Sequence, residues 1–111
     1  MAEPTLALVF GANASQTSTD IVIKKADLSS AGLTPSATNT AEALLLAINL
    51  KAKEGLTDAN RDTNIDQSVA ITDGYSPSIT TRNNAIYLRN TISIEVDKEL
   101  TGADVIDPDD Y

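Results

Sequence analysis

The longest regular pattern in the chain is an alternation of apolar and polar residues across positions 85–97. One face of this segment is interrupted only by Asn90 and otherwise carries Ile86, Leu88, Ile92, Ile94 and Val96. A period of two residues is typical of a β-strand with one buried face. At roughly a dozen residues, the strand would be about twice the usual length. We therefore expect it to be bent, bulged or long enough to pair with two partners.

The clearest helix signal runs from about residue 40 to residue 54. Asn39 and Glu42 have the spacing of a capping box, and Gly55 is typical of the residue that ends a helix. Between them, apolar side chains recur at steps of three and four residues, at Ala41, Leu44, Leu45, Ile48 and Ala52. This spacing predicts one apolar stripe, which we expect to cover the apolar face of the long strand.

Shorter segments predict the remaining strands. Residues 5–10 are apolar after Thr5 and are bounded by Pro4 and Gly11, which indicates a short buried strand. Residues 19–25 alternate in polarity, and we expect them to pair with that first strand as a hairpin. A third strand is predicted at 68–72, closed by a turn at Asp73 and Gly74. A second turn is predicted at Asn83 and Asn84.

Together these elements predict an α+β fold. We expect a single small domain, mainly an antiparallel sheet of four to five strands with one amphipathic helix (about 40–54) packed on it. A chain of 111 residues has room for one such domain. The domain is predicted to cover residues 1–102, followed by an acidic C-terminal arm at residues 103–111.

The composition excludes several kinds of chemistry. The chain contains no cysteine and no histidine, so it has no thiol nucleophile, no imidazole base and no zinc site built on nitrogen or sulfur ligands. Its net charge of −8 repels phosphate backbones and anionic membranes. We therefore expect no enzymatic activity, no cofactor, and neither nucleic acid nor membrane as a partner.

The N-terminal residues lack the basic start of a signal peptide. The apolar run 6–10 is too short for a membrane span. We expect a protein that is made and kept in a cytoplasm and is not secreted.

A polar segment at residues 58–66 has the alternating oxygen ligands of a calcium loop, at Asp58, Asn60, Asp62, Asn64 and Asp66. An EF-hand would also need a glycine at its sixth position and an acidic residue at its twelfth. Those positions hold Thr63 and Val69. We expect a solvated, turn-rich loop, and the alternative function is a small cation- or ligand-binding module that uses this loop.

Three acidic residues alternate near the end of the long strand, at Glu95, Asp97 and Glu99. Side chains two apart on one strand face are about 6.6 Å apart, which is within the range of paired catalytic carboxylates. Such catalysis also needs a pocket and one acid that is kept neutral. We interpret the three residues as a charged, solvated face that discourages edge pairing.

The C-terminal segment places an apolar pair, Val105 and Ile106, among acidic residues, with Pro108 to stiffen it. One interpretation is a frayed, repelling end. The other is a partner-binding arm anchored by its terminal tyrosine, with the start of the chain as a further contact. The residues predicted to bind a partner are Thr5, Val105, Ile106, Asp107, Asp109, Asp110 and Tyr111.

Four features of the chain together resemble a known class of proteins. They are the brief strand expected at the start, the middle rich in serine, threonine and asparagine, the lack of cysteine and histidine, and the acidic end. The chain resembles the small structural proteins of tailed bacteriophages, particularly capsid cement or decoration proteins of phages that infect cyanobacteria. This resemblance implies a non-enzymatic virion protein on the capsid surface, made in the host cytoplasm. Such a protein binds and stabilises a capsid lattice through strand edges and terminal arms. Its expected partners are the major capsid protein and copies of itself, as a homo-oligomer.

Overall fold

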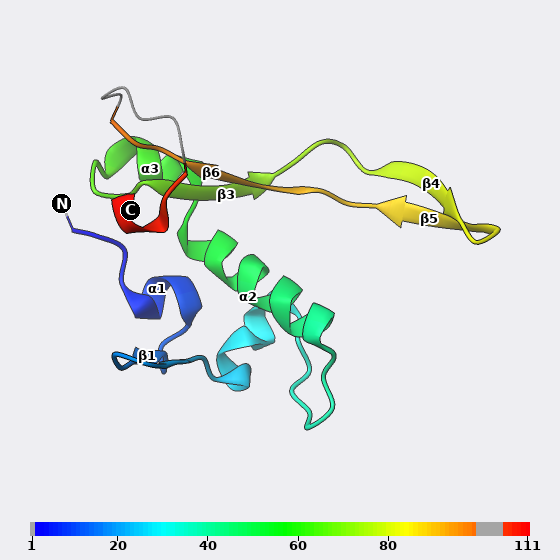
Figure 1. The fold of residues 1–111 in the computed structure, drawn as a ribbon, viewed down its shortest axis with the longest axis horizontal. Helices are drawn as coiled ribbons and strands as arrows, with labels where there is room; N and C mark the ends of the chain where they lie inside the picture. Colours follow the sequence, from blue (N-terminus) through cyan, green and yellow to red (C-terminus); the bar gives the residue numbers. More distant parts are fainter. Residues whose placement is uncertain (1, 100–105) are drawn as a thin grey trace.

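The longer helices lie in the first half of the chain, and the longer strands lie in the second half (Figure 1). The computed structural model describes residues 2–99 and 106–111. The helical elements there are α1 (Leu6–Phe10), the 3₁₀ helix η1 (Lys25–Ala31), α2 (Ala41–Gly55), α3 (Asp58–Thr63) and the 3₁₀ helix η2 (Pro108–Asp110). The strands are β1 (Ser15–Gln16), β2 (Ile21–Val22), β3 (Val69–Asp73), β4 (Ser78–Arg82), β5 (Ala85–Arg89) and β6 (Ile92–Val96). The predicted α+β class is confirmed.

The strands form three separate antiparallel pairs in place of one sheet of four to five strands. β1 pairs with β2, β3 with β6, and β4 with β5. The chain leaves the body through β3 and β4, turns, and returns through β5 and β6, so each of these strands has a single neighbour. The result is one long two-stranded ribbon that projects from the helices (Figure 1).

The predicted long strand is confirmed as β5 and β6, which pair with two partners in succession. The break between them falls at Asn90 and Thr91, close to the interruption that the sequence shows. There the Gly74 amide donates a hydrogen bond of 2.9 Å to the Thr91 carbonyl. A Cβ atom on Gly74 would lie 2.6 Å from the Thr91 Cγ2 atom, so only glycine allows this approach.

The predicted turn at Asn83 and Asn84 is confirmed, since both residues have positive φ angles, 49° and 61°. Two such residues between paired strands make a type I′ turn, whose twist matches that of a hairpin. The turn predicted at Asp73 and Gly74 is wrong. Asp73 is instead the last residue of β3, paired with Ile92.

The predicted helix is confirmed as α2, although its caps differ from those expected. The Thr40 hydroxyl accepts a hydrogen bond from the Ala43 amide at 3.1 Å, so Thr40 is the N-cap. The side chain of Asn39 instead accepts one from the Ser36 amide and stabilises the preceding loop. Gly55 lies inside the helix, where a Cβ atom would come within 2.6 Å of the Leu8 carbonyl oxygen. This glycine therefore serves the close approach of α1.

The strand predicted at residues 5–10 is wrong, because this segment forms helix α1. The Thr5 hydroxyl caps the helix by accepting a hydrogen bond from the Leu8 amide at 3.1 Å. A short apolar run has no clear period, and packing against α2 favours the helix here. The expected hairpin with residues 19–25 is consequently absent from the described structure, and β2 pairs with β1.

The core is small and lies where α2 meets β3. Its centre is Ala52, Leu56 and Ile71, and Val9, Val69 and Ile92 pack against it. The molecule measures 48 × 33 × 26 Å, with the ribbon running along its longest axis (Figure 1). The outer half of the ribbon therefore extends well beyond the core.

Candidate protein-binding site

The outer half of the ribbon, residues 78–89, is called the β-arm here. It consists of β4, the turn and β5, which contact each other and pack on no other element to a comparable extent. The register pairs Ile79 with Leu88 and Thr81 with Ile86, so one face of the β-arm carries three large apolar side chains. Their exposed fractions are 75% for Ile79, 78% for Ile86 and 65% for Leu88. This apolar face has no partner within the described chain.

The opposite face of the β-arm is polar and basic. The guanidinium carbon of Arg82 lies 4.6 Å from the centre of the Tyr87 ring, in a cation–π contact across the two strands. Arg89 is paired with Ser78 on the same face. The β-arm is thus amphipathic although no other element packs on it.

Charge is divided sharply between the β-arm and the rest of the chain. Residues 74–94 contain Arg82 and Arg89 and no acidic residue. All sixteen acidic residues and the other six basic residues lie outside this segment. A segment of formal charge +2 therefore projects from a remainder of formal charge −10.

An apolar groove of about 460 Å³ lies beside the base of the β-arm, between α2 and β6. We call it the α2–β6 groove, and it is lined by Glu42, Ala43, Leu45, Leu46, Asn49, Ile92 and Ile94. The C-terminal end of α2 packs near β3, whereas its N-terminal half diverges from the ribbon (Figure 1). Leu45, Leu46 and Ile94 are consequently exposed. The expectation that α2 covers the whole apolar face of the long strand is therefore wrong, because the cover stops near Ile92.

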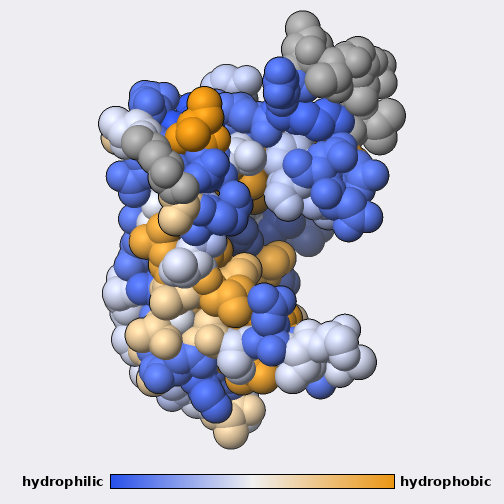
Figure 2. Space-filling model, turned by 90° about the vertical axis from the view of Figure 1, so that its left-hand side faces the viewer, coloured by the Kyte–Doolittle hydropathy of each residue, from blue (hydrophilic) through white to orange (hydrophobic). Residues whose placement is uncertain are grey.

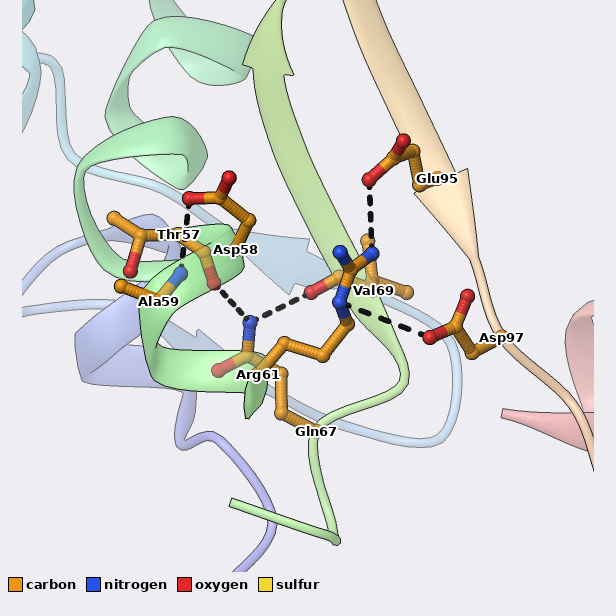
Figure 3. A network of polar contacts seen from close by, with 8 residues as sticks. All are labelled: Thr57, Asp58, Ala59, Arg61, Gln67, Val69, Glu95 and Asp97. Atoms are coloured by element: carbon orange, nitrogen blue, oxygen red, sulfur yellow. Dashed lines mark hydrogen bonds and ion pairs between the residues drawn. The ribbon is translucent and has the colours of Figure 1, made fainter. Parts of the chain in front are cut away.

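Glu95 in β6 and Asp97 just after that strand lie in a different polar network (Figure 3). Arg61 Nη1 donates a hydrogen bond to Glu95 Oε1 at 2.9 Å, and Arg61 Nε lies 3.7 Å from Asp97 Oδ2. The hydrogen bond that Arg61 donates to the Glu95 carboxylate raises the pKa of Arg61 above its ordinary value. One guanidinium therefore bridges the two carboxylates, and it connects α3 to β6.

The solvated, turn-rich loop expected at residues 58–66 is wrong, because α3 occupies residues 58–63. The Thr57 hydroxyl accepts a hydrogen bond from the Asn60 amide at 3.0 Å and begins this helix. The Asp58 carboxylate accepts one from the Ala59 amide, and the Asn64 side chain donates one to the Ala2 carbonyl. In residues 2–99 and 106–111, no group of three or more acidic, histidine or cysteine side chains is placed to hold a metal ion.

The buried side chain of Gln67 joins α3 to β3 (Figure 3). It is 4% exposed, and its amide nitrogen donates to the Thr57 carbonyl at 3.0 Å and to the Val69 carbonyl at 2.9 Å. The Thr57 carbonyl also accepts a hydrogen bond of 3.1 Å from the Arg61 amide, so the Gln67 side chain adds a second donor there and ties the start of α3 to β3. No pattern in the sequence points to this role, since glutamine is usually exposed.

Of the residues predicted to bind a partner, those that the structure describes lie at the end opposite the β-arm (Figure 1). Thr5 is the N-cap of α1, as described above, and Val105 lies outside the described residues. Ile106 is exposed, and the Asp107 carboxylate accepts a hydrogen bond from the Asp109 amide at the start of η2.

The last two residues contact the body of the molecule. Asp110 is paired with Lys98 at 2.9 Å. Tyr111 lines a small pocket together with Val9, Leu56 and Val69, so the tail ends beside α1 and β3. Partner binding by the tail stays a prediction.

The end opposite the β-arm also carries apolar side chains (Figure 2). Hydrophilic residues dominate the upper part of this view, and hydrophobic residues gather in its lower half, toward α1 and the β1–β2 pair. The exposed apolar residues of these elements are Leu8, Ile21 and Val22. They are less exposed than the apolar face of the β-arm, which remains the strongest candidate for a binding surface.

Comparison of the chain with protein-family models, with curated proteins and with solved structures finds no match. Among the described residues, none of the helices has the length and apolar character needed to cross a bilayer.

Proposed function

We propose that this chain is a non-enzymatic structural protein of a virion, which binds a capsid lattice by docking its β-arm on other proteins. Its place would be the capsid surface, as the sequence resemblance implies, and its partners the major capsid protein and copies of itself. The observation that carries the proposal is the exposed apolar face of the β-arm, at Ile79, Ile86 and Leu88.

This face is difficult to explain by the folding of one chain. A two-stranded hairpin gains little stability in water unless its apolar face packs on something. The β-arm contributes nothing to the core, which is centred on Ala52, Leu56 and Ile71. An exposed apolar surface on a projecting element is typical of a protein interaction site.

Two places could be considered as reaction sites, the α2–β6 groove and the carboxylates of Glu95 and Asp97. Both support an enzyme less well than a binding protein. The lining of the α2–β6 groove includes one charged side chain, Glu42. Glu95 and Asp97 form ion pairs with Arg61, whereas a general acid has to be held neutral. A binding protein accounts for both observations.

Many copies on a lattice make such a surface effective. When several weak contacts act together, the effective concentration of each rises and the protein is retained far longer than one contact allows. The tail residues Ile106, Asp107 and Asp109 would be secondary contacts in this arrangement.

The test is capture of the purified chain by lattices assembled from a candidate major capsid protein, measured by co-sedimentation. Ile86→Thr removes an apolar side chain from the β-arm and keeps a residue that favours strands. Ile65→Thr is the matched control, because Ile65 is 90% exposed and lies just after α3, away from the β-arm. We expect Ile86→Thr to weaken capture about tenfold, which corresponds to about 1.4 kcal/mol and to the burial of part of one such side chain. Equal capture of both variants and the wild type would contradict the proposal.

A further inference from the structure

We propose that the β-arm of one copy docks in the α2–β6 groove of a second copy of this chain. The inference rests on the proposed function, because it names the partner of the same arm. It is carried by the match of two apolar surfaces, by the division of charge along the chain, and by the geometry of the ribbon.

The two surfaces are of the same kind. The β-arm presents Ile79, Ile86 and Leu88, and the groove presents Leu45, Leu46 and Ile94 among its lining residues. Docking one against the other would remove both from water, which is the main favourable term in protein association. Neither surface has another partner among the described elements.

The groove cannot be filled by the β-arm of its own chain. Only Asn90 and Thr91 separate β5 of the arm from β6, which forms one wall of the groove. The ribbon extends away from α2 (Figure 1), and folding back would require it to reverse within those two residues. A β-arm that enters this groove must therefore come from another molecule.

Charge favours docking of the β-arm in the groove of a second copy over pairing with the β-arm of that copy. Pairing two β-arms through their apolar faces would bring two segments of formal charge +2 together, and like charges repel although Arg82 and Arg89 lie on the outer faces. Docking on the body instead brings a segment of formal charge +2 to a remainder of the chain with formal charge −10. The charged residue of the groove is Glu42, which is also acidic. Because the arginines lie on the polar face of the β-arm, they stay near the rim and steer the approach while the apolar face is buried.

The β-arm and the β6 wall of the groove follow one another along a single ribbon, and this order suggests how two copies are arranged. If two ribbons align antiparallel about a two-fold axis near their breaks at Asn90 and Thr91, each β-arm reaches the groove of the other copy. Both contacts are then made in one closed dimer, which is the commonest symmetry of homo-oligomers.

Sedimentation velocity of the full chain measures the dimer directly, with circular dichroism to verify that each variant is folded. We expect the wild type to shift from 11.7 kDa to twice that mass as its concentration rises into the micromolar range. Ile86→Thr in the arm and Leu45→Ser in the groove should each weaken dimerisation at least tenfold, and Ile65→Thr should leave it unchanged. A mixture of the arm variant and the groove variant should contain more dimer than either alone, because the mixed dimer keeps one intact contact.

A charge variant tests the steering step without touching the apolar surfaces. Arg82→Glu with Arg89→Glu should weaken dimerisation, whereas Lys24→Glu, an exposed change on the body, should not. A dimer that survives both the arm and groove variants would overturn the inference.

The outcomes also separate this inference from the proposed function. A chain that stays monomeric while Ile86→Thr abolishes capture by the capsid lattice would show that the arm binds the capsid protein, and would overturn the inference alone. A shift of the wild type by short duplex DNA, lost with the arginine variant, would assign the arm to nucleic acid and overturn both.

Discussion

The guanidinium carbon of Arg82 lies 4.6 Å from the centre of the Tyr87 ring, and this contact joins the two strands of the β-arm diagonally across one face. It lies outside the core, so it holds a projecting element in shape without contributing to the packing of α2 on β3. A rigid arm loses less conformational freedom when it docks than a flexible one does. The contact therefore links the local structure of the hairpin to its proposed role in binding.

Replacing Tyr87 by alanine should loosen the β-arm selectively. Cation–π contacts at exposed sites contribute about 0.5–1 kcal/mol, so we expect protection of the arm amides from hydrogen exchange to fall about two- to fivefold. Amides of α2 should be unaffected, because the arm does not pack on the helix. Tyr75→Ala, at an exposed tyrosine just outside β4, is the control. Equal loss of protection in α2 would contradict this account of the arm.

The hairpin turn should respond in opposite directions to two substitutions at Asn84, where φ is 61°. Asn84→Gly supplies the residue that a type I′ turn favours, and we expect greater protection of the arm amides. Asn84→Val forces a β-branched side chain into a left-handed conformation, at a penalty of about 1–2 kcal/mol, and protection should fall. Hydrogen exchange of β4 and β5 measures both. The same direction for the two variants would be inconsistent with this turn.

Gln67→Leu should lower the global stability. The substitution leaves the Val69 carbonyl without its buried donor, whereas the Thr57 carbonyl keeps the Arg61 amide, and one unsatisfied buried group costs about 1–3 kcal/mol. Urea unfolding followed by circular dichroism gives the free energy of unfolding. Gln16→Leu, at an exposed glutamine in β1, is the control and should change it little. A stability equal to the wild type would mean that the Gln67 bonds do not hold α3 to β3.

The ion pairs of Arg61 should make the attachment of α3 sensitive to salt. Arg61→Ala removes the contacts to Glu95 and Asp97, and we expect a lower melting temperature at low ionic strength. Because salt screens partly exposed pairs, the difference from the wild type should shrink in 1 M NaCl. Arg89→Ala, in the β-arm, should leave the melting temperature unchanged. A difference for Arg61→Ala that does not depend on salt would indicate lost packing instead.

The elements with strong periodicity could be predicted from the sequence. The helix at 40–54 and the long alternating strand both appear in the structure, and Asn83 with Asn84 forms the turn that their composition indicates. The first apolar run was wrongly predicted to be a strand, because a five-residue helix capped by Thr5 looks like a buried strand until α2 is placed beside it. In α3, the Thr57 cap and an ion pair from Arg61 to β6 support a sequence that resembles a polar loop.

The candidate site was harder to anticipate than the fold. Ile86 and Leu88 continue the same alternation as Ile92, so periodicity alone predicts that all of them are buried. Which part of a strand lies beyond its helix depends on the length of the helix and on the angle between them, neither of which the pattern contains. The available signal for an arm was the β-branched run of Ile79, Thr80 and Thr81 before the turn, in a segment without acidic residues.

Hydroxyl-radical footprinting of the assembled protein tests the central claim most directly, because it reports the exposure of single side chains. Labelling of Ile79, Ile86 and Leu88 would be compared by mass spectrometry between the dilute chain and assembled particles, with Ile65 as the internal reference. Docking of the β-arm predicts that labelling of the three residues falls several-fold on assembly while that of Ile65 stays constant. Unchanged labelling of all three in fully assembled particles would contradict the account.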